Sequence, residues 1–271
     1  MRKLNELIVL IKGGGEIGSA IAHRLVRCNI RVCITENSAP SEICRGASFS
    51  EAVFETTKAV EEMTAEKGLP TLEQVYKIWR NEHIPLLIDP EASVKPLLKP
   101  DVIVNAMMLK RETNARMTDA NLVIGIGPGF AAGVDVHMVI ESQEGIGLGD
   151  VILRGPVAPS ATEGVSHSVN KILLAEDTGL FTTDKNIGDA VLANDPIGSL
   201  GDKTIVAPIS GVLRGILRDQ SKVLTNDPLV EIDPQNNKES CFRIREQTRA
   251  IAGGVLEAIM MNFNVPDVVQ A

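Results

Sequence analysis

Three glycines near the start of the chain have the spacing of a phosphate-binding loop. Gly13, Gly15 and Gly18 form a G-x-G-x-x-G pattern directly after the apolar run 7–11. In such a loop the glycines allow a tight turn, close approach of a phosphate to the backbone, and close packing of the next helix on the strand. The N-terminus of that helix offers N–H donors and a positive dipole to the anion. The pattern therefore predicts a site for a nucleotide or another phosphate-bearing ligand.

Acidic, basic and further glycine residues could complete this site. Glu36 ends the next apolar segment, 18 positions after Gly18, where a carboxylate accepts hydrogen bonds from ribose hydroxyls. A second glycine-rich loop, 125–133, follows another apolar run, and loops at the carboxyl ends of parallel strands converge on one crevice. Arg45 is a candidate clamp for a phosphate or carboxylate. The predicted cofactor-binding residues are Gly13, Gly15, Glu16, Ile17, Gly18, Glu36, Arg45, Gly127 and Gly129.

Hydrolytic chemistry has no visible motif in the sequence. G-x-S-x-G, H-E-x-x-H and P-loop patterns are absent. Asp135 and His137 share one face of an expected strand, which suits a metal or acid–base pair, although a structural hydrogen bond is the favoured interpretation. His23, His83 and His167 belong to no cluster that the sequence reveals. We therefore expect no metal site and assign no catalytic residue.

Composition and charge limit the expected partners and location. The net charge of −8, without a basic stripe and interleaved aromatic residues, disfavours nucleic acid. No stretch approaches the roughly 20 apolar residues of a membrane span, and we expect neither a membrane partner nor a targeting segment. Cys28, Cys33, Cys44 and Cys241 form no C-x-x-C pair, which indicates reduced thiols in a cytoplasmic protein. Cys44, beside Arg45, is a candidate for a lowered thiol pKa.

The first half of the chain alternates strands with helices. Residues 7–36 have the length and patterning of one β-α-β unit, which would position the first glycine loop. Thr71 is the expected N-cap of the next long helix. Further elements are expected at 69–83 (helix) and at 84–89, 101–109 and 134–140 (strands). The sequence thus predicts an α/β fold with a Rossmann-like, mainly parallel sheet in a first domain, 1–145.

The second half contains an internal repeat. Residues 171–200 align without gaps on 203–232, and both copies contain V-L-x-N-D-P. Neither copy alone has enough strands to bury its apolar face, so we predict a small pseudo-two-fold all-β barrel or sandwich within a second domain, 146–240. The remaining segment, 241–271, is expected to form a C-terminal helix that is interrupted or softened at Gly253-Gly254.

Several motifs, in order along the chain, resemble the YqeB family. They include "KGGGEIGSAIAHRL", "ITENSAP", "IGIGPGFAAGVDVHMVIE" and "AIAGGVLEAI". The first portion is also similar to the Rossmann domain of the XdhC/CoxI accessory proteins. The resemblance implies an accessory protein for maturation of selenium-dependent molybdenum hydroxylases, with molybdenum cofactor as its ligand. It further implies a molybdenum hydroxylase or another maturation factor as partner.

Two alternatives remain open at this stage. Because G-x-G-x-x-G and Glu36 also fit NAD(P), the protein could be an NAD(P)-dependent oxidoreductase. It could also be a non-catalytic scaffold that docks a hydroxylase, and a homo-oligomer is possible. Glu16, in the first helical turn, would interact favourably with the helix dipole but compete with a bound phosphate, which weakens the dinucleotide interpretation.

Overall fold

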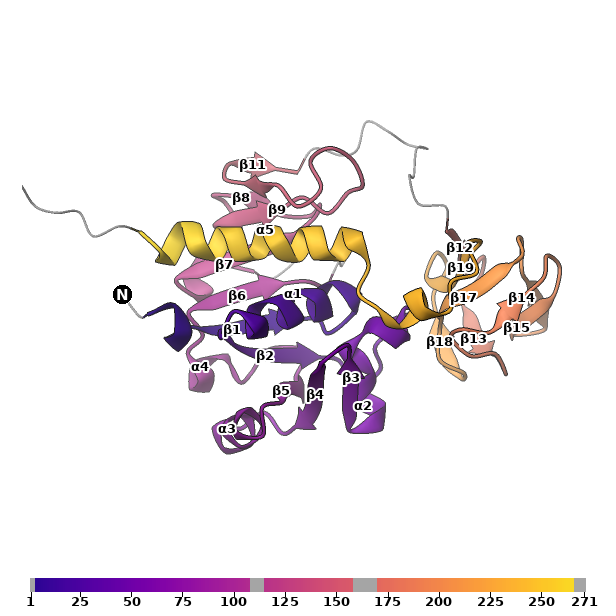
Figure 1. Cartoon of the computed structure of the whole chain (residues 1–271), viewed down its shortest axis with the longest axis horizontal. Coiled ribbons are helices and arrows are strands. Elements are labelled where there is room, and N and C mark those ends of the chain that lie inside the picture. Colours follow the sequence, from indigo (N-terminus) through magenta and orange to yellow (C-terminus); the bar gives the residue numbers. More distant parts are fainter. Residues whose placement is uncertain (1–2, 108–114, 158–169, 266–271) are drawn as a thin grey trace, which may run out of the picture.

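The computed structural model describes residues 3–107, 115–157 and 170–265. It has a mixed α/β fold with a large, mostly parallel sheet, separate smaller antiparallel sheets and a C-terminal helix, which confirms the predicted fold class at this level (Figure 1). The large sheet contains β1 (Ile8–Lys12), β2 (Arg31–Glu36), β3 (Thr57–Val60), β4 (Met63–Gly68), β5 (Ile84–Ile88), β6 (Val102–Asn105), β7 (Leu122–Ile126), β9 (Met138–Ile140) and β10 (Val151–Ile152). The α-helices are α1 (Glu16–Arg27), α2 (Ala52–Glu55), α3 (Leu72–Arg80), α4 (Lys95–Leu98) and α5 (Glu246–Phe263).

The strand order of the large sheet reverses at β1. The order is β10-β9-β7-β6-β1-β2-β5-β4-β3, and the pairs from β9 across to β4 are parallel. On one side of β1 the chain forms β2, continues to the edge strands β3 and β4, and returns to form β5 between β4 and β2. On the other side it moves outward through β6, β7 and β9. Such a switch point, at the carboxyl ends of the strands, is where open α/β sheets bind ligands.

Both faces of the sheet are covered, because the strands are apolar on both sides. Val9 and Ile11 pack in the core that contains α1 and α5, whereas Ile8 and Leu10 pack in the core under α3 and α4. Alternate side chains of a strand point to opposite faces, so one apolar run supplies both cores. The Thr71 prediction is confirmed: its hydroxyl accepts a hydrogen bond from Gln74 N at the start of α3, at 3.4 Å.

The C-terminal helix shares a core with the first domain. Ile251, Val255 and Ile259 of α5 are buried together with Ile21 and Leu25 of α1, and the two helices lie side by side along the sheet (Figure 1). Helix α5, which lies in the segment that we separated as 241–271, therefore completes the first domain's core.

The predicted interruption of this helix was wrong. Helix α5 runs through Gly253 and Gly254 without a break. The physical reason for Gly254 is close packing, since a Cβ at this position would lie 2.1 Å from the carbonyl oxygen of Gly149. The expected strand 134–140 was also too long, because Gly133 (φ +80°) and an Asp135 carboxylate that accepts from Ala131 N form a turn before Met138.

The repeat forms two four-stranded antiparallel sheets that share one core. Their orders are β12-β19-β17-β14 and β16-β15-β13-β18. The strands are β12 (Lys171–Leu174), β13 (Gly179–Thr182), β14 (Ala190–Val191), β15 (Pro196–Leu200), β16 (Lys203–Val206), β17 (Gly211–Ile216), β18 (Ser221–Val223) and β19 (Pro228–Asp233). We call them together the β unit. The offset of 32 residues converts β12, β13, β14 and β15 into β16, β17, β18 and β19, and so converts one sheet order into the other.

The Asn-Asp-Pro turns make matching hydrogen bonds in the two copies. Asn194 N donates to Ala207 O, and Asn226 N donates to Ala175 O, each at 2.8 Å. The two asparagines have φ of +71° and +70°, the left-handed region that asparagine tolerates well. Each turn therefore binds the strand that begins the other copy, and the copies are interlocked.

Outside the repeat, the two-residue strands β8 (Ala131–Ala132) and β11 (Gly155–Pro156) pair with each other in a separate antiparallel sheet.

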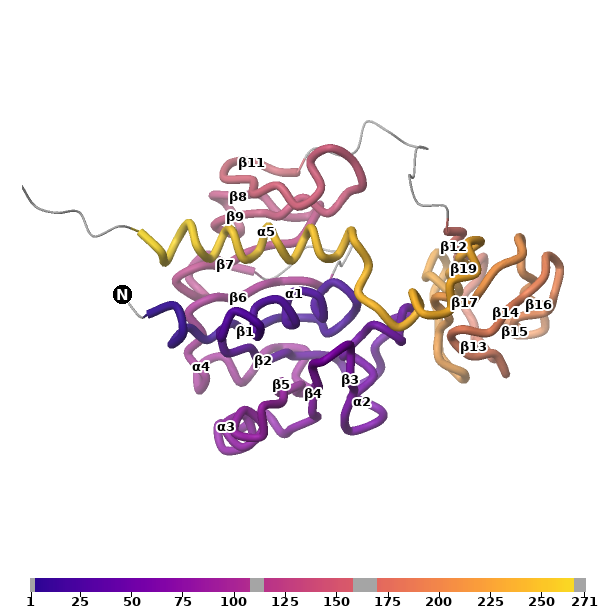
Figure 2. The backbone as a smooth tube through the Cα atoms, viewed as in Figure 1, coloured from indigo at the N-terminus to yellow at the C-terminus, as the bar shows by residue number. Residues whose placement is uncertain are grey.

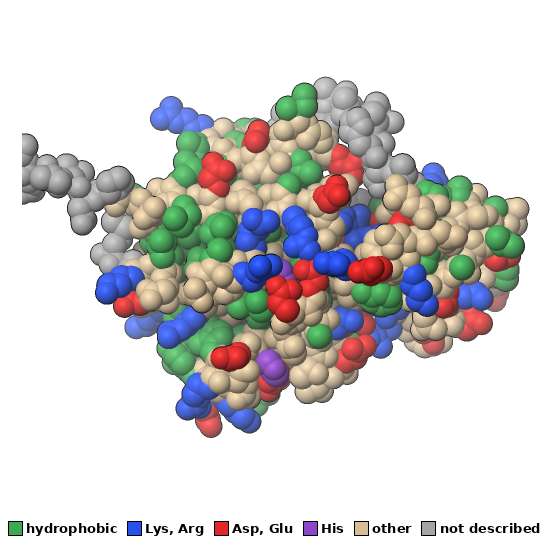
Figure 3. Space-filling view, in the orientation of Figure 1, with side chains coloured by type: hydrophobic (Ala, Val, Ile, Leu, Met, Phe, Trp, Pro, Cys, Tyr) green, Lys and Arg blue, Asp and Glu red, His purple; other side chains and the backbone are tan. Residues whose placement is uncertain are grey.

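The β unit lies at one end of the molecule, beside the start of α5 (Figure 2). Among the described residues, no helix is both long enough and apolar enough to cross a membrane. On the face shown in Figure 3, acidic and basic side chains are interspersed, and no large area of one sign is visible.

Candidate functional site

Two of the three loop glycines are required by packing. Gly13 has φ +98°, and a Cβ there would lie 3.2 Å from the backbone of Ala106 at the end of β6. A Cβ on Gly18 would lie 2.0 Å from Gly13 O, so Gly18 lets α1 approach the loop closely. Ile17 is half-buried and packs against the core beneath the helix.

The third glycine faces an internal anion. Gly15 is the N-cap of α1, and a Cβ there would lie 2.5 Å from Glu42 Oε2. That oxygen accepts a hydrogen bond from Glu16 N at 2.9 Å, and Glu42 Oε1 accepts from Cys44 N at 2.7 Å. Burial raises the pKa of Glu42, and the Glu16 carboxylate raises it further, while the two N–H donors oppose this shift. A carboxylate of the chain itself therefore occupies the place of an anion at the helix N-terminus.

Glu36 is buried and supports the same loop. Its Oε2 accepts from Gly14 N at 2.8 Å, and its Oε1 accepts from Asn37 N at 2.7 Å. Burial raises the pKa of Glu36, and the two N–H donors lower it in part. Both carboxylate oxygens thus already have backbone donors at the position where a ribose hydroxyl was expected.

The second glycine loop lies on the same edge of the sheet. Gly127 and Gly129 follow β7 with φ of +73° and +102°, and Gly127 N donates to Ile140 O at 2.8 Å. Because only β6 separates β7 from β1, the two loops are two strand spacings apart, about 10 Å. The strand order is therefore consistent with the predicted convergence of the two glycine loops on one crevice.

Glu16 belongs to a buried cluster that joins α1 to the β unit. We call Glu16, Cys44, Arg214, Glu231 and Arg245 the arginine–carboxylate cluster. Glu16 Oε1 accepts from Arg214 Nη2 at 2.7 Å and from Arg245 Nε at 2.9 Å. Arg245 Nη2 also donates to Glu231 Oε2 at 2.9 Å, and both guanidinium groups lie 3.1 Å from Cys44 Sγ. Sequence reasoning placed only Glu16 and Cys44 among the candidates of this region and missed the other three residues.

The expectation of a lowered thiol pKa at Cys44 was wrong. Burial raises the pKa of Cys44, the carboxylates of Glu16 and Glu231 raise it further, and Arg245 only partly opposes them. The thiol also donates to Glu231 Oε2 at 3.1 Å. A neutral thiol held as a hydrogen-bond donor is a poor nucleophile, so Cys44 is a structural member of the cluster.

The cluster predicts a pH dependence of stability. Burial raises the pKa of Glu231, but the positive charges of Arg245 and Arg214 lower it more strongly, to about 2. Because the unfolded chain has the ordinary value of 4.5, ionised Glu231 stabilises the fold above that pH, and its contribution is lost as the pH falls from 4.5 to about 2. Urea unfolding across this range is expected to show a shallower pH dependence for Glu231→Gln than for wild type. The same pH dependence in wild type and Glu231→Gln would contradict this role of Glu231. The control is Glu91→Gln, at an exposed position, which should show the pH dependence of wild type.

Arg45 does not lie free beside the glycine loop. Its Nε donates to Ile216 O at 2.7 Å, and its Nη1 is 3.4 Å from Glu51 Oε2. The residue that we predicted as a phosphate clamp therefore binds a carbonyl and a carboxylate of its own chain, and connects the first domain to β17.

Asp135 and His137 make structural hydrogen bonds, as the favoured interpretation predicted. Asp135 Oδ2 accepts from Ala131 N, and His137 Nδ1 accepts from Val123 N, each at 3.0 Å. Burial lowers the pKa of His137, which favours the neutral ring that this bond requires.

The expectation that His23 has no cluster partners was wrong. Its Nε2 lies beside the carboxylates of Glu61 and Glu62, in the turn between β3 and β4. His83 pairs with Glu66 at 2.8 Å, its one ion pair among the described residues. His167 lies outside the described residues.

Fold and site together define an α/β protein with a glycine-rich loop at the switch point of a mostly parallel sheet. The chain is similar to the uncharacterized protein YqeB of Escherichia coli (strain K12), with 34% identity over 259 residues. These residues are 94% of this chain and 47% of the relative, so the chain spans about half the length of the curated relative it matches. This similarity supports the assignment of the chain to the YqeB family, which the sequence motifs predicted. No protein-family model matches the chain.

Proposed function

We propose that the protein is an accessory factor in the maturation of selenium-dependent molybdenum hydroxylases, and that it binds molybdenum cofactor or a related phosphate-bearing ligand at the glycine loop. The observation that carries the proposal is the Glu42 carboxylate at the N-terminus of α1, 2.9 Å from Glu16 N. An anionic oxygen already accepts the N–H donor that a phosphate would use. The resemblance to the YqeB family supplies the expected ligand class and the hydroxylase partner.

Ligand binding in this proposal is an exchange of anions. A phosphate displaces Glu42 from Glu16 N, and the missing Cβ of Gly15 leaves room for the approach. Burial and the Glu16 carboxylate raise the pKa of Glu42, so protonation of Glu42 would reduce its competition with a phosphate for Glu16 N. The second loop, across β6, supplies the other wall of the ligand site. The proposal assigns binding and delivery of the ligand, and it assigns no chemical step to a residue.

The Glu42→Ala variant tests this exchange. Because it removes the competing carboxylate, the dissociation constant for pyrophosphate and for the pterin dinucleotide cofactor is expected to fall roughly tenfold, on the order of 1.4 kcal/mol. Isothermal titration calorimetry measures both ligands. The matched control is Glu91→Ala, an exposed glutamate outside the loop, which should bind as wild type.

A second variant tests the position of the ligand. Gly15→Asp adds a carboxylate at the N-cap and is expected to abolish binding of both ligands, with folding checked by circular dichroism. Unchanged affinities in both Glu42→Ala and Gly15→Asp would place the ligand elsewhere. Wild-type protein purified from a host that makes the cofactor should also release pterin and molybdenum above the level from a host that does not.

The NAD(P) alternative has less support from the site. Both oxygens of Glu36 accept backbone N–H groups, so the carboxylate is already engaged where a ribose would need it. Titration with NADH separates the two functions. Tight, saturable binding of NADH that Gly15→Asp abolishes would favour the oxidoreductase.

A further inference from the structure

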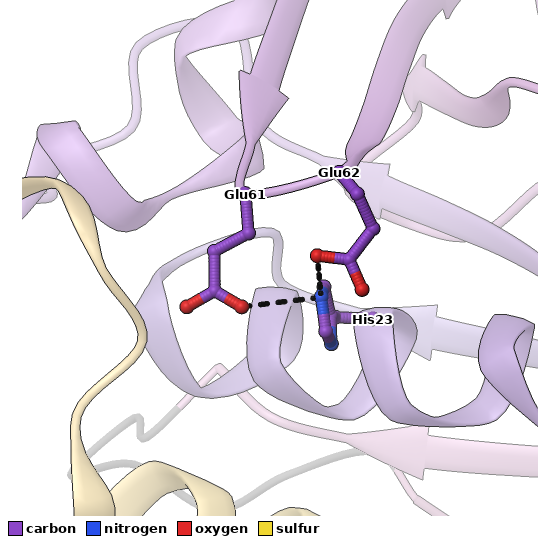
Figure 4. Close-up of side chains that lie close together, drawn as sticks. All are labelled: His23, Glu61 and Glu62. Atoms are coloured by element: carbon purple, nitrogen blue, oxygen red, sulfur yellow. Dashed lines mark ion pairs between the residues drawn. The ribbon is translucent and has the colours of Figure 1, made fainter.

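A histidine and two glutamates converge outside the glycine loop. His23 lies on α1, and Glu61 and Glu62 form the turn between β3 and β4 (Figure 4). His23 Nε2 lies 3.3 Å from Glu61 Oε2 and 3.2 Å from Glu62 Oε2. His23 is seven residues beyond Glu16, about 10 Å further along the helix, so this group is separate from the ligand loop.

The histidine nitrogen is buried and lacks a hydrogen-bond partner. His23 is only 3% exposed, and its Nε2 makes no hydrogen bond to any described residue, although two carboxylate oxygens are near. A buried nitrogen that lies close to two carboxylate oxygens but makes no hydrogen bond requires an explanation. Two donors that are each about 2.1 Å from one ion lie about 3.0–3.4 Å apart at octahedral to tetrahedral angles. The two nitrogen–oxygen distances fall in this range.

The other oxygens of both carboxylates are held by separate partners. Glu61 Oε1 accepts from Arg249 Nη2 and from Ile244 N, and Glu62 Oε1 pairs with Arg27 Nη1 at 3.3 Å. These contacts leave Oε2 of each glutamate directed at His23. Metal-binding carboxylates commonly have such outer partners, which fix their orientation.

The turn itself is built to place the glutamates. Glu61 has φ +52°, in the left-handed region that glycine and asparagine occupy more easily. Val60 pairs with Met63, so the turn between them contains only Glu61 and Glu62. The tight turn therefore places both glutamates next to each other, opposite His23 on α1.

We propose that His23 Nε2, Glu61 Oε2 and Glu62 Oε2 bind a divalent transition-metal ion of the zinc class. One imidazole and two carboxylates suit zinc, manganese or iron, whereas magnesium and calcium prefer sites made of oxygen alone. Glu62 is 52% exposed, so the ion has access from solvent and keeps positions for water. The ion would connect α1 to the β3–β4 turn and, through Arg249, to α5.

Titration with zinc chloride tests the site, with manganese and magnesium chloride for comparison. Wild-type protein is expected to bind one zinc ion, and zinc should raise its thermal unfolding midpoint. Glu62→Gln should weaken zinc binding at least roughly tenfold and remove the rise, because it replaces a charged ligand with a neutral amide. Glu62 is half exposed, so this variant should fold as wild type does without metal.

The matched control is His83→Gln. His83 also pairs with a carboxylate, Glu66, at 2.8 Å, but among the described residues no second carboxylate pairs with it. The variant His83→Gln should therefore leave the affinity for zinc unchanged, whereas His23→Gln should abolish zinc binding. The cobalt complex gives a second readout, since d–d absorption should appear in wild type and not in Glu62→Gln. Absence of stoichiometric binding in wild type, or equal affinity in wild type and Glu62→Gln, would overturn the proposal.

Discussion

Arg214→Met is expected to lower the free energy of unfolding by about 3–5 kcal/mol, the typical effect of removing one partner of a buried ion pair. Arg214 is 4% exposed and donates to the Glu16 carboxylate, and its other Nη atom lies 3.7 Å from Glu231. Its loss leaves two buried carboxylates with Arg245 as their remaining cationic partner in the cluster. Urea denaturation measures the change.

A surface ion pair and a double variant complete this experiment. Lys203 pairs with Asp177, and both are mostly exposed, so Lys203→Met should have no measurable effect on unfolding. The double variant Glu16→Leu/Arg214→Met should be less destabilised than the sum of its single variants, because it removes the unpaired charge together with its partner. A loss below about 1 kcal/mol for Arg214→Met would mean that the cluster is solvated in solution.

Two adjacent glycines of α5 are expected to respond to alanine with opposite signs. Gly254→Ala places a Cβ 2.1 Å from Gly149 O, a backbone atom between β9 and β10, so either that segment or α5 must shift. It should destabilise the protein by about 1–3 kcal/mol or more, as overpacking does. Gly253→Ala meets no atom closer than Arg24 Nη1 at 4.0 Å and gains helix propensity, so it should stabilise by about 0.4–1 kcal/mol.

Each of these two variants serves as the control for the other, since both substitutions add one methyl group to the same helix. Urea midpoints of the two variants and wild type are sufficient for the comparison. Equal effects of the two substitutions would mean that α5 does not pack on the loop of Gly149 in solution.

Local signals in the sequence predicted the elements but not the partners of the site. The apolar run 7–11 and the hydroxyl of Thr71 act within a few residues, and both predicted their elements correctly. Glu42 fills the anion position from a loop 26 residues beyond Glu16, and nothing in its neighbours indicates this contact. An isolated carboxylate in a polar loop has the same local pattern whether it is solvated or bound.

The arginine–carboxylate cluster could not be predicted because its members lie far apart in sequence. Arg214 and Glu16 are 198 residues apart, and their contact depends on how the β unit lies against α1. One signal was present: Arg214 is the single charged residue of "GVLRGI", which is buried throughout. A charge inside an otherwise apolar strand predicts an internal counter-charge, although it does not say which one. The His23 group was missed for the same reason, since Glu61 lies 38 positions after His23.

The pairing of α1 with α5 also sets an order of events during synthesis. Arg27 at the end of α1 and Glu246 at the start of α5 are separated by 219 positions, and the whole β unit is translated between them. At about 5–20 residues per second, the ribosome needs tens of seconds to cover this interval. Throughout that time Ile21 and Leu25 lack Ile251, Val255 and Ile259, the α5 side chains of their shared core. The β unit, whose strands follow one another along the chain, can fold first, so the nascent chain exposes the apolar face of α1 that α5 covers until α5 emerges.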